Sequence, residues 1–239
     1  MDKKDLEKLL MRFSHLGISH SKNGALLIGK APHIAEYAWL NVMYPCATET
    51  EIYDLEKRLG CAIPKVYKDF LMNVSNGFDI MNCTLALHGC RTSYNRADLD
   101  SWYPFNLEDI QKYERPKNAT PEMFIFASYD YDGSKLYLNT SDDKIYFCSP
   151  YDATPLKSWD SLSAMLTSEI ERIFGLFDAD GHCIDEDVPT TWRFRSKGPQ
   201  KTDDYFGVKP PKKDPILDKK GRELGSRASI FRSIATQLS

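Results

Sequence analysis

The stretch EIYDLEKRLGCAIPKVYKDFL, residues 51–71, carries the strongest structural signals of the chain. Thr48 and Glu51 have the spacing of a capping box, in which each side chain accepts a hydrogen bond from the other residue's backbone amide. Apolar residues then recur on one helical face, and Gly60 readily adopts the left-handed conformation that ends a helix. Pro64 suits the first turn of a second helix. The stretch therefore predicts two consecutive helices.

The regions before and directly after this stretch give weaker signals. Residues 4–13 have apolar side chains spaced on one helical face and predict a short N-terminal helix. Residues 25–28 predict a brief strand, whereas residues 34–43 predict a helix or a turn. Asn76 and Gly77 should end the second helix of the pair.

The second half of the chain changes to strand-like alternation. Apolar residues alternate with polar or small ones, and turn-forming residues separate the runs, which is typical of an antiparallel meander. The predicted strands cover residues 83–87, 124–127, 136–138 and 145–148. A long loop over residues 91–105 and a short helix beginning at Asn106 follow the first of them. A closing helix should span residues 159–174.

These elements predict an α+β fold, with an antiparallel sheet of about four to six strands and helices packed mainly on one face. We expect this domain to occupy residues 1–190. Residues 191–239 are predicted to be a basic arm that begins as a linker rich in Lys, Pro and Asp. Its last part, residues 224–238, has apolar residues at helical spacing and predicts an amphipathic helix.

The charge of the chain is divided unevenly. The net charge of −3 combines a balance of +7 on residues 193–239 with a balance of −10 on residues 1–192. An acidic body repels phosphates and attracts basic proteins, so we expect the main domain not to bind nucleic acid directly. Excess carboxylates also serve solubility, and charge alone does not decide between the two roles.

Composition favours a globular cytoplasmic protein. No apolar run approaches the roughly 20 residues that a bilayer requires, and the charged start of the chain does not resemble a signal peptide. The 6 cysteines form no closely spaced pairs, so we expect reduced, mostly buried thiols. These features predict a cytoplasmic location without a membrane partner.

The common sequence signatures of hydrolases, nucleotide-binding proteins and zinc proteases do not occur in the chain. His88 with Cys90, and His182 with Cys183, could each supply two zinc ligands. A closed zinc site needs four ligands, however, and buried thiols with exposed imidazoles are the simpler interpretation. We therefore expect no enzymatic activity, no metal and no cofactor.

Two further segments allow a functional and a structural interpretation. Asp178 and Asp180 suggest calcium, but Gly181 stands fourth from Asp178, whereas an EF-hand loop has its glycine sixth, so a plain acidic turn is favoured. Trp192 to Arg195 alternates aromatic and basic residues, as sites for single-stranded nucleic acid do. The structural interpretation is that Trp192 and Phe194 anchor the arm to the domain.

The chain from residue 51 onward resembles the SUKH superfamily. The pattern of that superfamily is E-I-x-x-L-E-x-x-L-G, two or three residues, L/I-P-x-x-Y-x-x-F-L and then N-G, and the resemblance covers about residues 35–175. Helix caps, turn glycines and core residues carry it, so it specifies a fold rather than a catalytic set. These residues are Glu51, Leu55, Glu56, Leu59, Gly60, Ile63, Pro64, Tyr67, Phe70, Leu71, Asn76, Gly77, Gly89, Gly133 and Trp159, the last of which should open the closing helix.

The resemblance implies a function in toxin immunity. Most bacterial members look like immunity proteins that bind and neutralise the toxic domain of a polymorphic or contact-dependent toxin, often a nuclease or deaminase. An acidic body suits blocking a basic active site. We therefore expect a non-catalytic cytoplasmic protein that binds its cognate toxin domain through an acidic surface. The candidate contact residues are Asp130, Asp132, Asp142 and Asp143, because turns of a meander hold side chains outward.

Two other functions stay open at this point. Fungal relatives look like regulators of cell-wall synthesis and signalling, so the alternative is an intracellular regulatory scaffold that engages its partner with the C-terminal amphipathic helix. In the structural interpretation of that helix, Phe231 and Leu238 dock on the chain's own domain. The other open function is that of an enzyme, which a deep pocket gathering His88, Cys90 and a carboxylate would indicate.

Overall fold

The computed structural model describes residues 1–95 and 97–192. The predicted basic arm lies outside this part of the chain except for its first two residues, and so does its amphipathic helix. Among the described residues, none of the helices has the length and apolar character needed to cross a lipid bilayer.

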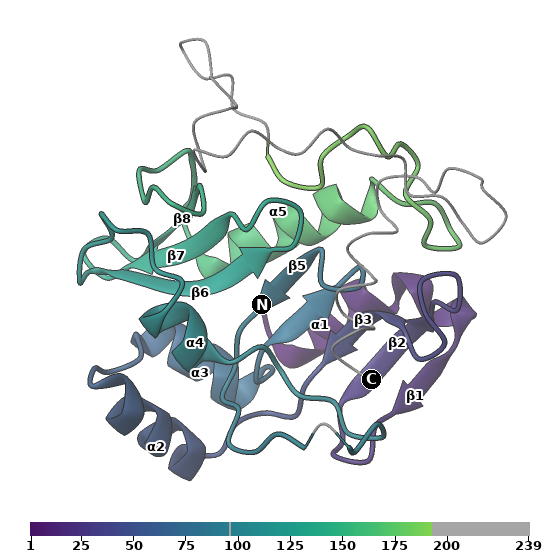
Figure 1. Cartoon of the computed structure of the whole chain (residues 1–239), viewed down its shortest axis with the longest axis horizontal. Helices are drawn as coiled ribbons and strands as arrows, with labels where there is room; N and C mark the ends of the chain where they lie inside the picture. Colours follow the sequence, from purple (N-terminus) through teal and green to yellow (C-terminus); the bar gives the residue numbers. More distant parts are fainter. Residues whose placement is uncertain (96, 193–239) are drawn as a thin grey trace, which may run out of the picture. The chain divides into compact units, whose positions relative to one another are not determined.

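In the part of the chain that the structure describes, nine antiparallel strands form one sheet, and each strand pairs with its neighbours in sequence (Figure 1). The prediction of an α+β fold with an antiparallel sheet is confirmed, whereas the prediction of four to six strands is wrong. The strands are β1 (Ile18–His20), β2 (Leu26–Lys30), β3 (Trp39–Met43), β4 (Phe78–Ile80), β5 (Leu85–Leu87), β6 (Met123–Tyr129), β7 (Lys135–Asn139), β8 (Lys144–Cys148) and β9 (Lys157–Trp159).

The missed strands lack a readable period. β1, β4 and β9 have three residues each, too few to show alternation. β3 was expected to be a helix or a turn, but four of its five residues are buried, which conceals the polar–apolar alternation of a strand. Cys83, expected in a strand, lies instead in the turn before β5 with a φ of 69°.

The predicted helix pair is confirmed. These helices are α2 (Glu49–Leu59) and α3 (Lys65–Asn73), with Pro64 at the N-cap of α3. The Thr48 amide donates to the Glu51 carboxylate (2.8 Å), and the Glu51 amide donates to the Thr48 hydroxyl (3.2 Å). Gly60 ends α2 with a φ of 71°. Local capping chemistry therefore sets both ends of α2.

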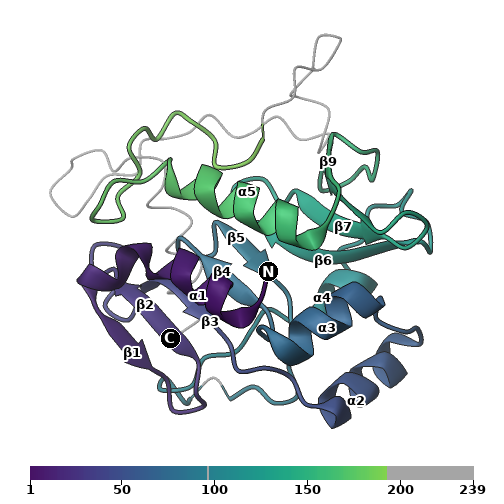
Figure 2. The same ribbon diagram turned by 180° about the vertical axis from the view of Figure 1, so that it is seen from behind.

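Three helices lie on one face of the sheet: α1 (Lys3–Leu10), α3 and α5 (Leu162–Phe174) (Figure 2). A short 3-10 helix, Met11–Leu16, continues α1 and packs Phe13 edge-on against Phe174 of α5. α4 (Leu107–Lys112) lies against β6 on the other face, where the Gln111 side chain donates to the Ile125 carbonyl (2.5 Å).

Trp159 does not open the closing helix. It is the last residue of β9, and α5 begins at Leu162, because the Ser161 side chain accepts a hydrogen bond from the Ala164 amide and caps the helix there. The Trp159 side chain is still mostly buried, and its ring nitrogen donates to the Ser168 hydroxyl on α5 (3.3 Å). The residue thus joins the edge strand to the helix.

The remaining family residues have structural roles. Leu55, Ile63, Tyr67, Phe70 and Leu71 are buried in the core between α2, α3 and the sheet. The Glu56 carboxylate accepts from the Ile63 amide (2.8 Å) and pairs with Lys68. Leu59 packs against the core, and Gly77 and Gly133 have φ values of 81° and 76°. None of these contacts requires a ligand.

Candidate partner-binding surface

A long loop between β5 and α4 crosses the sheet face opposite α1, α3 and α5. We call its described residues, 90–95 and 97–105, the crossing loop. Its two ends meet: the Gly89 amide donates to the Phe105 carbonyl (2.8 Å), and the Leu107 amide donates to the Gly89 carbonyl (2.9 Å). A long surface loop with joined ends and no helix or strand of its own is frequently functional.

Asn76 holds the start of the crossing loop. Its side-chain amide donates to the Cys90 carbonyl (2.8 Å), and its side-chain oxygen accepts from the Cys90 amide (2.7 Å). A Cβ atom on Gly89 would stand only 2.2 Å from the Asn76 carbonyl oxygen, so this approach requires glycine. The family residues Asn76 and Gly89 therefore fix the position at which the loop leaves the sheet.

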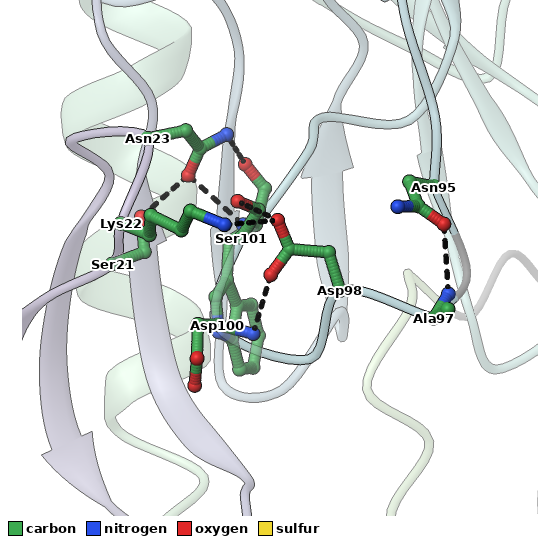
Figure 3. Close-up of polar contacts among 9 residues, drawn as sticks. Ser21, Lys22, Asn23, Asn95, Ala97, Asp98, Asp100 and Ser101 are labelled. Carbon is green, nitrogen blue, oxygen red and sulfur yellow. Dashed lines mark hydrogen bonds and ion pairs between the residues drawn. The ribbon is translucent and has the colours of Figure 1, made fainter.

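The far part of the loop is fixed to the turn between β1 and β2 (Figure 3). The Asn23 side chain donates to the Trp102 carbonyl (2.6 Å) and accepts from the Trp102 amide (3.0 Å). The Lys22 amide donates to the Asp100 carbonyl (2.8 Å), and the Lys22 ammonium pairs with Asp98 (3.1 Å). Hydrogen bonding to Lys22 holds the pKa of Asp98 below its ordinary value. The loop is thus anchored at its base and at its far part.

Under the loop lies a small apolar cluster, separate from the main core. It consists of Ala25, Leu27, Val42 and Tyr44, and Trp102 of the crossing loop packs against it. The cluster continues into a polar group, because Val42 on β3 is directly opposite Asp79 on β4. Residues directly opposite on adjacent strands point to the same face. Asp79 therefore faces the side of the sheet that the loop crosses.

Asp79 is a buried carboxyl with one of its two oxygens hydrogen-bonded. The Tyr44 hydroxyl donates to Asp79 Oδ2 (2.6 Å), whereas Asp79 Oδ1 has no partner among the described residues. Only 4% of the residue is exposed. Burial raises the pKa of Asp79 to about 7, and it also raises the pKa of Tyr44. Asp79 can therefore gain or lose a proton near neutral pH.

His88 supports the base of the loop and is poorly suited to catalysis. Its Nδ1 faces the Asn106 carbonyl (3.4 Å) and its Nε2 faces the Ser128 hydroxyl (2.9 Å). Because a carbonyl only accepts, Nδ1 carries the proton and Nε2 accepts from Ser128. Burial lowers the pKa of His88 to about 4. A neutral, enclosed imidazole is a structural spacer rather than a general base at pH 7.

The outer side of the loop exposes apolar side chains. Tyr94, Leu99 and Phe105 are 57%, 64% and 44% exposed. The Arg91 guanidinium lies over the Tyr94 ring, 5.0 Å from its centre, and pairs with Asp109 (3.2 Å). Exposed aromatic side chains beside an arginine are typical of the centres of protein–protein interfaces.

The predicted contact carboxylates do not form one surface. Asp130 and Asp132 lie in the turn between β6 and β7, which confirms that this segment is a hairpin turn, and Asp142 and Asp143 lie in the next turn. These turns are at opposite ends of β7, so the four side chains form two separated pairs. Asp142 also accepts from the Tyr146 hydroxyl (2.6 Å), which lowers its pKa.

The sequence predicts a loop over residues 91–105 but does not indicate that this loop forms a site. Four aromatic residues within residues 90–105, in a stretch without helical or strand period, were the available signal. The contacts that fix the loop, such as that between Asn23 and Trp102, join residues 79 positions apart. Such a pairing leaves no periodic trace in one sequence.

Two grooves occur on the helix face. One, of about 530 Å³, lies between α1 and α5, and the other, of about 620 Å³, lies between α3 and α5. His88 and Cys90 line neither of them. Neither groove is therefore the pocket with His88, Cys90 and a carboxylate that would indicate an enzyme.

The metal-ligand candidates have ordinary surroundings. Across residues 1–95 and 97–192, no three His, Cys, Asp or Glu side chains are placed to hold a metal ion together. The Asp178 carboxylate accepts from the amides of Asp180 (3.0 Å) and His182 (2.8 Å), so this segment is the acidic turn that was favoured. Cys90 and Cys148 are buried, Cys61 is exposed, and the other three cysteines are partly exposed. The expectation of mostly buried thiols is therefore wrong.

Trp192 anchors the start of the arm, as its structural interpretation predicted. Its ring nitrogen donates to Glu169 (2.8 Å), and the Lys157 ammonium lies 3.8 Å from the ring centre. Phe194 and the neighbouring arginines lie outside the described residues. The contacts of Trp192 therefore match its structural interpretation.

Comparison with known proteins identifies the family. Residues 46–168 match the family model described as SMI1 / KNR4 family (SUKH-1). No curated protein sequence matches the chain significantly. The match falls within residues 35–175, where the sequence pattern resembled the SUKH superfamily, and it covers more than half of the chain. The chain therefore belongs to the SMI1/KNR4 (SUKH-1) family.

Proposed function

We propose that this chain is a cytoplasmic immunity protein that binds and neutralises a cognate toxin domain without catalysing a reaction. The observation that carries the proposal is the crossing loop, which displays Tyr94, Leu99 and Phe105 and is fixed by hydrogen bonds at its base and at its far part. Family membership supports it, because the bacterial members of the superfamily resemble immunity proteins.

The fixed loop suits tight binding. Association costs free energy for every side chain and loop that must be ordered, and a loop that is already held loses less on binding. Aromatic side chains bury a large area with few rotatable bonds. The loop therefore has the two properties that a high-affinity contact surface needs.

The charge of residues 1–192 supports a basic partner. A balance of −10 attracts a positively charged domain over several ångströms and speeds its encounter. Toxins that act on nucleic acid need basic surfaces to hold phosphates. We infer a nucleic-acid-acting toxin domain as the partner, with the loop as the contact and the acidic body as the source of attraction.

The surroundings of His88 and Cys90 support the proposal that the chain is not an enzyme. His88 is neutral and enclosed, and burial raises the pKa of the Cys90 thiol to about 12, so that it remains protonated. A protonated thiol is a weak nucleophile. Neither group is poised to transfer a proton or attack a substrate at neutral pH.

The test begins with the reading frames beside this chain's gene, where the proposal expects a large secreted protein with a toxic C-terminal domain. That domain is produced in a bacterial host with and without the full-length chain, and growth and complex formation are measured. We expect growth to be restored and a stable complex to form. Absence of both would contradict the proposal.

A pair of double variants locates the contact. Tyr94→Ala with Leu99→Ala removes two exposed side chains of the crossing loop. We expect affinity to fall about 1,000-fold, because two strong interface residues at about 2 kcal/mol each contribute about 4 kcal/mol together. The matched control is Tyr53→Ala with Ile184→Ala, which removes an aromatic and an aliphatic side chain that are 66% and 65% exposed elsewhere. Equal affinities of the two variants would exclude the loop.

A further inference from the structure

A continuous set of contacts joins the crossing loop to the buried carboxyl of Asp79. Trp102 of the loop packs on the apolar cluster that contains Tyr44, and the Tyr44 hydroxyl donates to Asp79 (2.6 Å). Tyr44 and Asp79 are only 4% exposed each. The loop therefore packs on the cluster that contains the hydrogen-bond partner of this carboxyl.

The carboxyl is enclosed in a way that favours its neutral form. One oxygen, Oδ1, has no hydrogen-bond partner among the described residues, and a buried charge without sufficient partners is strongly unfavourable. Among the residues that the structure describes, the Tyr44 hydroxyl is the one contact that stabilises the charged form. Desolvation outweighs this hydrogen bond and raises the pKa of Asp79 to about 7.

The charged and titratable neighbours do not relieve this cost. Cys83, in the turn between β4 and β5, feels the charges of both Asp79 and Asp130, which helps to raise the pKa of its thiol, so the surroundings are acidic. Arg91 of the crossing loop acts electrostatically on Tyr44, but its guanidinium pairs with Asp109 (3.2 Å). Within residues 1–95 and 97–192, no cation therefore pairs with an ionised Asp79.

The turn beside Asp79 is also conformationally strained. Met81, Asn82 and Cys83 have φ values of 46°, 51° and 69°, in the region that residues other than glycine seldom adopt. Three such residues in succession persist only where the surroundings hold them, and strained segments of this kind are found at switch regions. The Met81 amide is held by the Asn41 side chain (3.2 Å).

We propose that the crossing loop is seated on the sheet when Asp79 is protonated and is released when Asp79 ionises. Release of Trp102 admits water to the apolar cluster, so that Tyr44 and the free oxygen of Asp79 become hydrated. The loop is the surface assigned above to the toxin, so the biological meaning of this switch rests on the proposed function. The proton-linked movement itself does not depend on any partner.

The test is hydrogen exchange of the isolated full-length chain between pH 6 and pH 8, expressed as protection relative to intrinsic exchange. The reporters are the amides of Lys22 and Trp102, which bond to Asp100 and Asn23 across the loop contact. For a carboxyl that titrates near 7 in the seated state and far lower in the released state, we expect protection to fall about tenfold over this range. The fall should be unchanged by a low concentration of urea, which distinguishes local release from global unfolding.

Asp79→Asn should abolish the fall, because an amide stays neutral at every pH. Tyr44→Phe removes the hydrogen bond that stabilises the charged form and should move the change to higher pH; it also provides a second test if Asp79→Asn does not fold. Asp100→Asn, which changes an exposed carboxylate of the loop, is the matched control and should behave like the wild type.

A fall that persists in Asp79→Asn, or that is absent from the wild type, would overturn the proposal. A fall that depends on urea as strongly as global unfolding does would also overturn it. Each of these results would leave the immunity function untouched. Conversely, failure of the chain to bind the toxin domain would leave the proton-linked movement standing.

Discussion

Two buried carboxyl groups in this protein have contrasting surroundings. Glu169, on α5, is fully buried and accepts hydrogen bonds from the Tyr129 hydroxyl (2.6 Å), the Arg172 guanidinium (2.7 Å) and the Trp192 ring (2.8 Å). Asp79 accepts one, from Tyr44. Glu169 is stabilised by three donors. Asp79 has one donor, so its burial costs free energy, and it is therefore the candidate for a switch.

Replacing Glu169 by Ala should lower the free energy of unfolding by about 3–5 kcal/mol, because it leaves the Arg172 charge and two other donors without their acceptor. Urea unfolding followed by circular dichroism measures this change. Glu171→Ala, at an exposed position on the same helix, is the control and should change stability by less than about 0.5 kcal/mol. Equal midpoints for the two variants would show that the buried network contributes nothing.

The overall stability should fall as pH rises through neutrality. The folded pKa of Asp79, about 7, exceeds its ordinary value of 3.8, so its contribution is fully present below about pH 4 and is lost as pH rises through 7. The shift corresponds to a loss of up to about 4 kcal/mol. Asp79→Asn should remove this dependence and be more stable than the wild type at pH 8. Parallel curves of stability against pH for the wild type and Asp79→Asn would contradict the assignment of this dependence to Asp79.

At the scale of elements, close backbone approach fixes the crossing loop. Gly89→Ala should destabilise the protein by more than about 2 kcal/mol, because the new methyl group would meet the Asn76 carbonyl at 2.2 Å. Gly60→Ala is the comparison: it has a φ of 71° but nothing within 4 Å, so it should cost only about 1 kcal/mol of backbone strain. Thermal or urea unfolding of both variants shows which one is less stable. A Gly60→Ala variant that is less stable than Gly89→Ala would contradict this account.

An element could be predicted from the sequence when residues close to it in the sequence determine it. The α2–α3 pair was predictable because Thr48, Glu51 and Gly60 cap α2 with neighbours in sequence. β4 was not predictable, because its three residues are held by pairing with β3 and β5. The crossing loop was predictable as a loop but not as a site, because its anchors at Lys22 and Asn23 come from a distant turn.

At the scale of the whole molecule, long-range charge and local contact should affect different rate constants. Changing Asp130, Asp132, Asp142 and Asp143 to Asn reduces the negative charge at both ends of β7, so it should slow association with the toxin domain and flatten its salt dependence. The Tyr94→Ala and Leu99→Ala variant should instead speed dissociation. Surface plasmon resonance at several salt concentrations separates the two effects. An unchanged association rate for the Asn variant would exclude these turns from the encounter.

The most direct test of the central claim is hydrogen exchange of the full-length chain alone and in complex with the toxin domain. If the chain neutralises its partner by covering it with the crossing loop, newly acquired protection will concentrate in residues 90–105 and in the β1–β2 turn that holds them. Protection confined to the helix-face grooves beside α5, with the crossing loop unchanged, would contradict the claim.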